Sequence, residues 1–183
     1  MIPLLIVLAI VVVLVIFVIS LYNNLVKFRN RIENAWAQID VQLKRRWDLI
    51  PNLVETVKGY ASHEKDTLEA VISARNAAAT AEGPQASAQS ENMLSGALRQ
   101  LFALSEAYPD LKANTSFLEL QEELTSTEGR IAFARQHYND TVLKYNTAIQ
   151  TFPAVVIAGS LRFTEREYFE VDDESRGTVS VEF

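Results

Sequence analysis

The chain contains no cysteine, which excludes disulfides, thiolate metal sites, cysteine nucleophiles and acylation of a lipoprotein cysteine. It also has few turn-forming residues, with 6 glycines and 5 prolines among 183 residues. Alanine, leucine, glutamate and glutamine are plentiful instead, a composition typical of long helices. We therefore expect one all-α domain beside any membrane anchor, because the length leaves little room for a second folded unit.

Positive charge is in short supply as well. The net charge is -6, and residues 165–182 alone hold seven acidic residues against two arginines. The rest of the chain is close to neutral, without the basic surface that binding to phosphates requires. The sequence therefore predicts no nucleic-acid partner.

Residues 4–22 form one long apolar run, LLIVLAIVVVLVIFVISLY, without a single charge. As a helix this run would reach about 28 Å, which matches a hydrocarbon core of about 30 Å. It lacks the basic leader and the small-residue cleavage site of a signal peptide, so we expect it to remain as an anchor. Lys27, Arg29 and Arg31 follow the run, whereas only the terminal amine precedes it. The positive-inside rule then predicts an N-terminus outside the cell and a C-terminal domain in the cytoplasm.

Apolar residues continue at helical spacing beyond this span and fall into columns eleven residues apart. The columns are Leu25, Trp36 and Trp47; Phe28, Ile39 and Ile50; and Ile32, Leu43 and Val54. The first helix is therefore expected to continue from the membrane to about Tyr60. Pro51 would either end or kink this helix, and a kink is favoured because the apolar spacing resumes at Val54.

Three further helices are expected from caps and breakers. The second runs from about His63 to Ala81, with Ser62 as its N-cap, and Gly83-Pro84 follows it. The third carries Leu94, Leu98 and Leu101 and ends near Tyr108-Pro109. The fourth begins at a cap formed by Asn114 or Thr115 and runs to Phe152, before Pro153.

The fourth helix repeats the eleven-residue columns of the first, with Leu120, Ile131 and Val142 in one and Thr127, Tyr138 and Ile149 in another. Both helices would extend about 55 Å beyond the membrane, against about 30 Å for the middle pair. The expected fold is thus a transmembrane helix continuing into an antiparallel four-helix bundle of two long outer and two shorter middle helices, with a short irregular tail. A four-helix head would lie far from the membrane and a two-helix stalk beside it.

The corresponding domains are a transmembrane anchor at 1–22, a cytoplasmic helical bundle at 23–153, and an apolar segment with an acidic tail at 154–183. By the same geometry, Phe152 returns to the membrane surface. The apolar residues 154–161 would then lie against lipid headgroups, against the stalk or against a neighbouring subunit.

The sequence contains few residues in patterns that metal binding or catalysis requires. The two histidines are His63 and His137, and neither has the glutamate three residues earlier that a di-iron bundle requires. They would bind a metal together, with Glu64 and Asp140, only if their helix ends met. Phosphate loops, nucleophile elbows and zinc-protease motifs are absent from the sequence. We therefore predict no catalytic, cofactor-binding or metal residues, no cofactor, and a protein that is not an enzyme.

Each group of charged or aromatic residues has a purely structural interpretation as well as a functional one. Lys44-Arg45-Arg46 would lie about 35 Å beyond the interface on a straight helix, too far for lipid, so a solvated face or ion pairs are expected, with a partner protein as the alternative. The acidic residues expected to form such ion pairs are Glu119, Glu122 and Glu123. The basic residues after the span are expected to set orientation, with specific lipid recognition as the alternative. Core packing, and not a cofactor cage, is expected for Trp36, Trp47, Tyr138 and Tyr145.

Three stretches carry a resemblance to a known family: AWAQIDVQLKRRWDLIPNLVETVKGYASHE at 35–64, YPDLKANTSFLELQEELTSTEGRIAFARQHYNDTVLKYNT at 108–147, and IQTFPAVVIAG at 149–159. Over nearly its whole length the chain resembles the LemA family of bacterial membrane proteins. The resemblance implies an N-terminal anchor in the bacterial plasma (inner) membrane, with the N-terminus outside, and a cytoplasmic antiparallel helical bundle. The biochemical function of that family is poorly defined, and related chains include proteins of magnetosome membranes.

From these observations we expect a non-enzymatic, single-pass membrane scaffold that self-associates and organises or shapes the membrane or its proteins. Its partners would be the lipid bilayer, further copies of the chain and other membrane proteins. The alternative is a monomeric membrane adaptor that binds a protease, transporter or signalling protein through its head. An enzyme is a third option, which a specifically bound metal or nucleotide would reveal.

Overall fold

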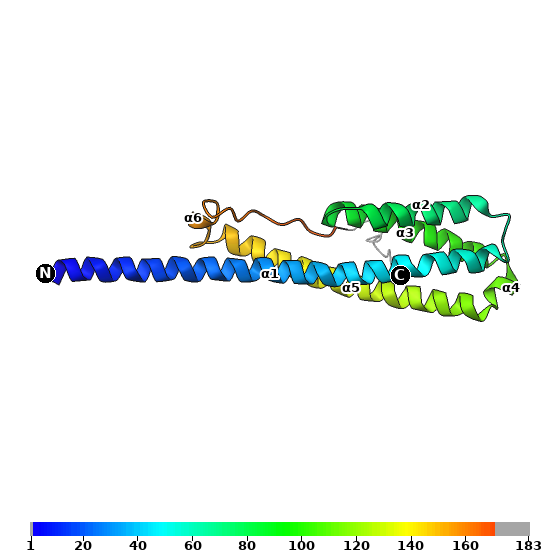
Figure 1. Ribbon diagram of the computed structural model, residues 1–183, viewed down its shortest axis with the longest axis horizontal. Helices are drawn as coiled ribbons and strands as arrows, with labels where there is room; N and C mark the ends of the chain where they lie inside the picture. Colours follow the sequence, from blue (N-terminus) through cyan, green and yellow to red (C-terminus); the bar gives the residue numbers. More distant parts are fainter. Residues whose placement is uncertain (1, 171–183) are drawn as a thin grey trace, which may run out of the picture. The chain divides into compact units, whose positions relative to one another are not determined.

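The computed structural model describes residues 2–170, and all regular structure within that range is helical (Figure 1). The helices are α1 (Ile2–Lys58), α2 (Lys65–Thr80), α3 (Pro84–Ser105), α4 (Pro109–Lys112), α5 (Thr115–Gln150) and α6 (Val155–Ala158). The expectation of an all-α chain with a long apolar N-terminal helix is confirmed. The one-turn helices α4 and α6 were not expected. Most of the expected acidic tail lies outside the described residues.

Pro51 lies inside α1, which continues to Lys58, so the alternative in which the helix ends near Ile50 is excluded. Proline lacks the N–H that the helix would use at this position, and the loss weakens one turn. Leu53, Val54 and Val57 are buried on the far side of that turn, and Ile50 is buried before it. Packing on both sides of the proline therefore holds the helix together.

The helix boundaries follow local chemistry, with one correction. Ser62 does not cap α2: the residue before that helix is Glu64, and it makes no side-chain cap bond. The helix begins later because the backbone first makes a turn in which Glu64 N–H donates to the Ala61 carbonyl at 3.1 Å, with Ala61 buried. Gly83 precedes α3 at φ 85°, a conformation that side chains disfavour. Asn114 caps α5 as expected, since its Oδ1 accepts the Phe117 N–H at 3.0 Å.

The contacts divide the described chain into two units. Unit 1 contains residues 2–37 and 136–166, and unit 2 contains residues 38–135 and 167–170. In unit 1, most of the buried apolar residues of α1 and α5 come from the eleven-residue columns, with Ala35 and Tyr145 buried beside them. The rings of Trp36 and Tyr138 meet edge to face at 5.4 Å between centroids. Such ring pairs contribute about 0.5–1.5 kcal/mol beyond the area that they bury.

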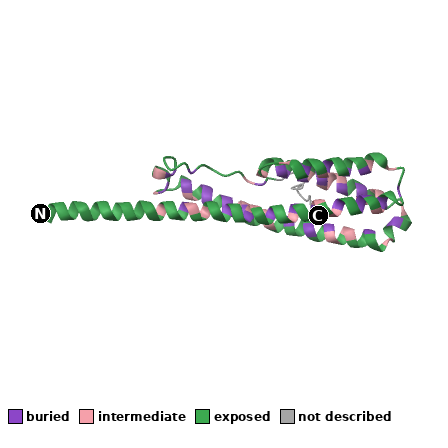
Figure 2. Ribbon diagram, viewed as in Figure 1, coloured by how far each residue is buried: buried purple, intermediate pink, exposed green. Residues whose placement is uncertain are grey.

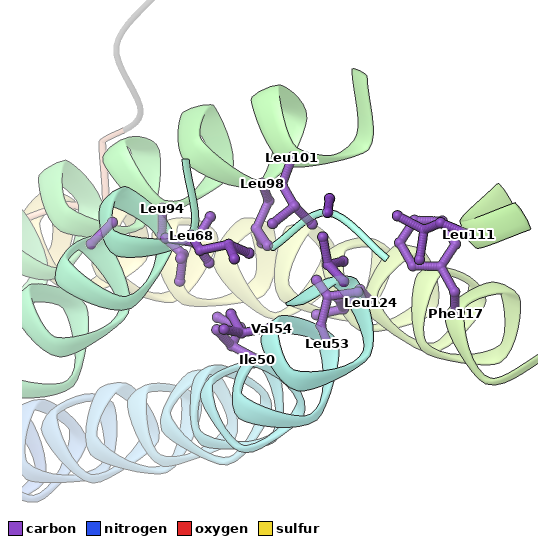
Figure 3. Packing of buried hydrophobic residues seen from close by; sticks show 14 of the residues in the cluster. Ile50, Leu53, Val54, Leu68, Leu94, Leu98, Leu101, Leu111, Phe117 and Leu124 are labelled. Carbon is purple, nitrogen blue, oxygen red and sulfur yellow. The ribbon is translucent and has the colours of Figure 1, made fainter. Parts of the chain in front are cut away.

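Unit 2 has one apolar core, built from the end of α1, α2, α3, α4 and the start of α5 (Figure 3). Leucines dominate it, and Leu53, Leu94, Leu101 and Leu111 are completely buried. Each such side chain contributes about 1.5–3 kcal/mol relative to its exposed state. Leu111 is the residue by which the one-turn helix α4 joins the core.

The eleven-residue columns predicted which face of each long helix is buried. Six of the nine column residues of α1 are buried and the other three are half-buried. In α5, Leu120 is half-buried, and the remaining five column residues are buried. Figure 2 shows the buried stripe in α5 and in the later part of α1, whereas the N-terminal part of α1 is exposed on every face.

Candidate functional site

The first part of α1 is the feature of unit 1 that bears most directly on function. Residues 2–20 are exposed all around the helix, and they include all but the last two residues of the charge-free apolar run. Within residues 2–170, α1 is the one helix that is long and apolar enough to cross a membrane, and its apolar window is not buried by any other part of the chain. A helix that is apolar on all sides needs an apolar surrounding, which a bilayer supplies.

At the end of this span, the chain returns and contacts α1. The rings of Tyr22 and Phe163 meet edge to face at 5.7 Å between centroids, and Leu25 is buried close by in sequence. We call residues 152–163 the return segment. It contains α6 (Figure 1). The Tyr22–Phe163 contact joins it to the end of the span.

The return segment has two faces of different character. Ala154, Ala158 and Phe163 are buried at 3–7% exposure. The opposite face carries large apolar side chains that are exposed: Phe152 at 83%, Val155 at 48%, Val156 at 68% and Leu161 at 38%. Of the three positions foreseen for this apolar stretch, the inward face thus packs within unit 1, and the outward face has no protein over it in the described chain.

A helix-ending turn explains how the segment separates these faces. Arg162 has a left-handed φ of 59°, its N–H donates to the Gly159 carbonyl at 3.1 Å, and the Phe163 N–H donates to the Ala158 carbonyl at 3.0 Å. This is the Schellman pattern, in which the residue after the left-handed one packs back on the last turn. It turns Phe163 inward and leaves Arg162 exposed.

Three polar side chains of α5 hold the chain that follows. Tyr145 donates its hydroxyl to the Thr164 carbonyl at 2.9 Å. The amide of Asn146 pairs with the backbone of Arg166 in both directions, each bond being 2.9 Å long. Gln150 donates to Glu165 at 2.7 Å. Burial raises the pKa of Tyr145, with Arg166 and Arg29 acting in the opposite direction, so the phenol remains a protonated donor.

The basic residues after the span are exposed, as orientation signals or headgroup contacts would be. Lys27, Arg29 and Arg31 are all exposed on α1, and the guanidinium of Arg31 lies 5.7 Å from the centre of the Phe28 ring. Arg162 is exposed in the same unit. Unit 1 therefore presents positive charge together with the apolar face of the return segment.

Unit 2 contains a buried polar cluster that the sequence interpretation missed. Arg46 is 5% exposed and donates to Glu91 at 3.0 Å and to Ser95 at 2.8 Å. Trp47 donates its indole N–H to the same carboxylate at 2.6 Å. Burial raises the pKa of Glu91, an effect that the nearby Arg46 charge and the hydrogen bonds from Trp47 and Arg46 oppose. The Arg46 Nε has no hydrogen-bond partner within residues 2–170.

The three basic residues at 44–46 thus have different surroundings. Lys44 is exposed, and Arg45 forms the expected type of ion pair, with Glu123. Arg46 also forms an ion pair, with Glu91 and not with the acidic residues that were named, and it is buried because it lies between Leu43 and Ile50 on the buried stripe. Glu91 gave a signal too: it lies three residues before Leu94 and seven before Leu98, on the apolar face of α3.

The remaining candidates lie as follows. His63 is exposed in unit 2 and His137 is exposed in unit 1. No group of three histidine, aspartate or glutamate side chains suited to a metal occurs in the described part of the chain. Tyr138 and Tyr145 are buried, and Trp36 and Trp47 are half-buried, so the prediction of core packing for these four aromatic residues is confirmed.

Comparison with known proteins agrees with a membrane-associated chain. The model of the LemA family matches residues 35–183. A protein LemA of Metamycoplasma hominis is 27% identical over 161 residues, which is 86% of this chain and 72% of that protein. Magnetosome protein MamQ 2 of Paramagnetospirillum magneticum and magnetosome protein MamQ of Magnetospirillum gryphiswaldense are 25% and 27% identical, over 81% of this chain. The chain spans 64% of the length of these two magnetosome proteins.

Proposed function

This chain belongs to the LemA family, and from that premise we propose that it is a membrane-anchored scaffold without enzymatic activity. In this proposal the protein self-associates in the bilayer and organises or shapes the membrane or its proteins. It resides in the bacterial plasma (inner) membrane, with the N-terminus outside and the helical units in the cytoplasm. The bilayer, further copies and other membrane proteins are its partners.

The observation that carries the proposal is the fully exposed, charge-free span of α1. It must be covered by lipid, by other spans or by both, and it continues without a helix break to Lys58. The relatives named as magnetosome proteins support a role at a membrane. The basic residues that follow the span support the proposed orientation.

The span also limits how self-association can work. It contains no pair of small residues four apart, such as GxxxG, that would let two backbones approach closely. Its Val, Ile and Leu side chains can pack against another copy, but lipid tails are equally apolar, so such packing alone is weak. We therefore propose that the helical units take part in the assembly.

The mass of the purified protein tests self-association. Three forms are compared in native membrane discs or gentle detergent: the full chain, a form lacking residues 1–22, and a form in which residues 4–22 are replaced by leucines. We expect a large homogeneous assembly from the full chain. Its persistence in the leucine form would assign assembly to the helical units, and its loss there would assign it to the span.

A full chain that is monomeric at all protein-to-lipid ratios would contradict the proposal. The protein would then act as a monomeric adaptor, and binding of a protease, transporter or signalling protein would be measured next. A metal or nucleotide that copurifies in stoichiometric amount would argue against a purely structural role.

A further inference from the structure

The outward face of the return segment is a large apolar surface next to a membrane span. Phe152, Val155, Val156 and Leu161 present it, with exposures between 38% and 83%. The inward face is already occupied, so the segment cannot bury these side chains by turning over. Exposed apolar clusters of this kind mark surfaces that a membrane or another molecule covers.

The position of the segment identifies what covers it. Phe163, at the end of the segment, contacts Tyr22, at the last residue of the charge-free run. Tyrosine is favoured where a span meets the headgroups, because its ring is apolar and its hydroxyl is polar. The return segment is therefore at the level at which α1 leaves the bilayer.

The charges of unit 1 fit the same surrounding. Arg162 lies beside Leu161 and is exposed, and Lys27, Arg29 and Arg31 are exposed on α1 just beyond the span. Apolar side chains flanked by exposed basic residues are the pattern of segments that lie in the headgroup region of anionic membranes. A protein partner would need a complementary acidic and apolar surface at that depth.

We propose that the return segment is a second membrane contact, in which Phe152, Val155, Val156 and Leu161 insert at the boundary between headgroups and acyl chains. Unit 1 then holds the bilayer both through the span of α1 and through residues that are about 130 positions later in the chain. Two contacts restrict the rotation and tilt of unit 1 in the membrane, which one helix does not. The inference requires no second copy and is independent of self-association.

The absence of cysteine makes a direct test possible, because any single cysteine is the only labelling site. V156C is labelled with an environment-sensitive fluorophore in the full chain and reconstituted in vesicles of phosphatidylcholine and phosphatidylglycerol. L143C is the matched control, since Leu143 is apolar, 54% exposed and on the same unit, about 10 Å of helix before the end of α5 at Gln150. V155C serves as a second position, and circular dichroism confirms that each variant is folded.

We expect nitroxides attached near the ester end of the lipid chains to quench the label at 156 and at 155 at least about threefold more than the label at 143. Iodide in the water should show the opposite order. Equal exposure to iodide at 156 and 143 would overturn the proposal. A label at 156 that is shielded from both quenchers would also overturn it, because protein, and not lipid, would then cover the segment.

Discussion

At the scale of single residues, Arg46 and Glu91 form the most unusual interaction in the described chain. Each side chain is 6% exposed, so both charged groups have left water. The cost of that transfer commonly exceeds the attraction between the two charges, and the raised pKa of Glu91 indicates the same balance here. We therefore expect the cluster to specify how α1 and α3 pack within unit 2 more than it stabilises the protein.

Replacement of Arg46 tests this balance. R46M should lower the free energy of unfolding by about 3–5 kcal/mol, because it leaves the Glu91 carboxylate buried without a counter-charge. The double variant R46M/E91L should recover wild-type stability or exceed it by about 1–4 kcal/mol. Chemical denaturation of the full chain in detergent gives these values.

The neighbouring Arg45 provides the matched control. Its ion pair with Glu123 is 45% and 35% exposed, so R45M should change the free energy of unfolding by no more than about 1 kcal/mol. Similar losses in R45M and R46M would show that the burial of Arg46 has no energetic consequence. A double variant as unstable as R46M would show that the pair is a net source of stability.

The pKa of Glu91 leads to a separate prediction for E91Q. A carboxyl group whose pKa is raised in the folded state favours folding when protonated, and that contribution is lost as the pH rises from the unfolded value of about 4.5 through the folded value. The free energy of unfolding of wild type should therefore fall, relative to that of E91Q, as the pH rises above 4.5. Thermal unfolding of both across this range measures the difference. A difference of the opposite sign would mean that Arg46 lowers the pKa of Glu91 more than burial raises it.

At the scale of elements, the periodicity of the sequence predicted the long helices but not the short ones. The eleven-residue columns fix the buried face of α1 and α5 because each helix repeats its contacts over many turns. The one-turn helices α4 and α6 have no such repeat. They exist because Leu111 and Ala158 dock against neighbouring elements, which is tertiary information. Ser62 failed as a cap for a similar reason, since burial of Ala61 sets where α2 begins.

The basic residues of α1 likewise show what the sequence predicts and what depends on tertiary contacts. Arg45 and Arg46 are neighbours in a charged run, and charge alone gives both the same expectation, a solvated face or an ion pair. The phase of the helix separates them, because Arg46 is three residues after Leu43 and four before Ile50, both of which are buried. Composition therefore predicts the class of a segment, whereas the direction of one side chain requires the helix phase and a partner such as Glu91 on another helix.

Asn146 connects α5 to the chain that follows the return segment, and its replacement tests that connection. N146A removes both hydrogen bonds to the Arg166 backbone. Each bond contributes about 0.5–1.5 kcal/mol, so exchange of the Arg166 amide hydrogen should become about tenfold faster. Q150A is the control, because it removes an exposed bond to Glu165 one turn later. Hydrogen exchange followed by mass spectrometry or NMR distinguishes them, and equal acceleration in both variants would show that Asn146 has no special role.

At the scale of the whole molecule, the proposed orientation rests on three side chains. Lys27, Arg29 and Arg31 are the basic residues within about 20 positions of the span, the range over which the positive-inside rule acts. The next basic residue is Lys44. Moving the charge from one end of the span to the other should therefore invert the protein in the membrane.

The variant I2K/P3K/K27Q/R29Q/R31Q makes this change, and S126C reports the outcome, because Ser126 is exposed on α5 and the chain has no other thiol. In the single variant S126C, an impermeant maleimide should label the thiol only after the spheroplast membrane is opened. In the five-residue charge variant that also carries S126C, it should label the thiol in intact spheroplasts. K27Q/R29Q/R31Q without the added lysines should give a mixture of the two orientations.

Labelling of the single variant S126C in intact spheroplasts would place residue 126 outside the cell and reverse the proposed orientation. An unchanged pattern in the five-residue variant would mean that folding of the helical units, and not the charge balance, decides which side they occupy.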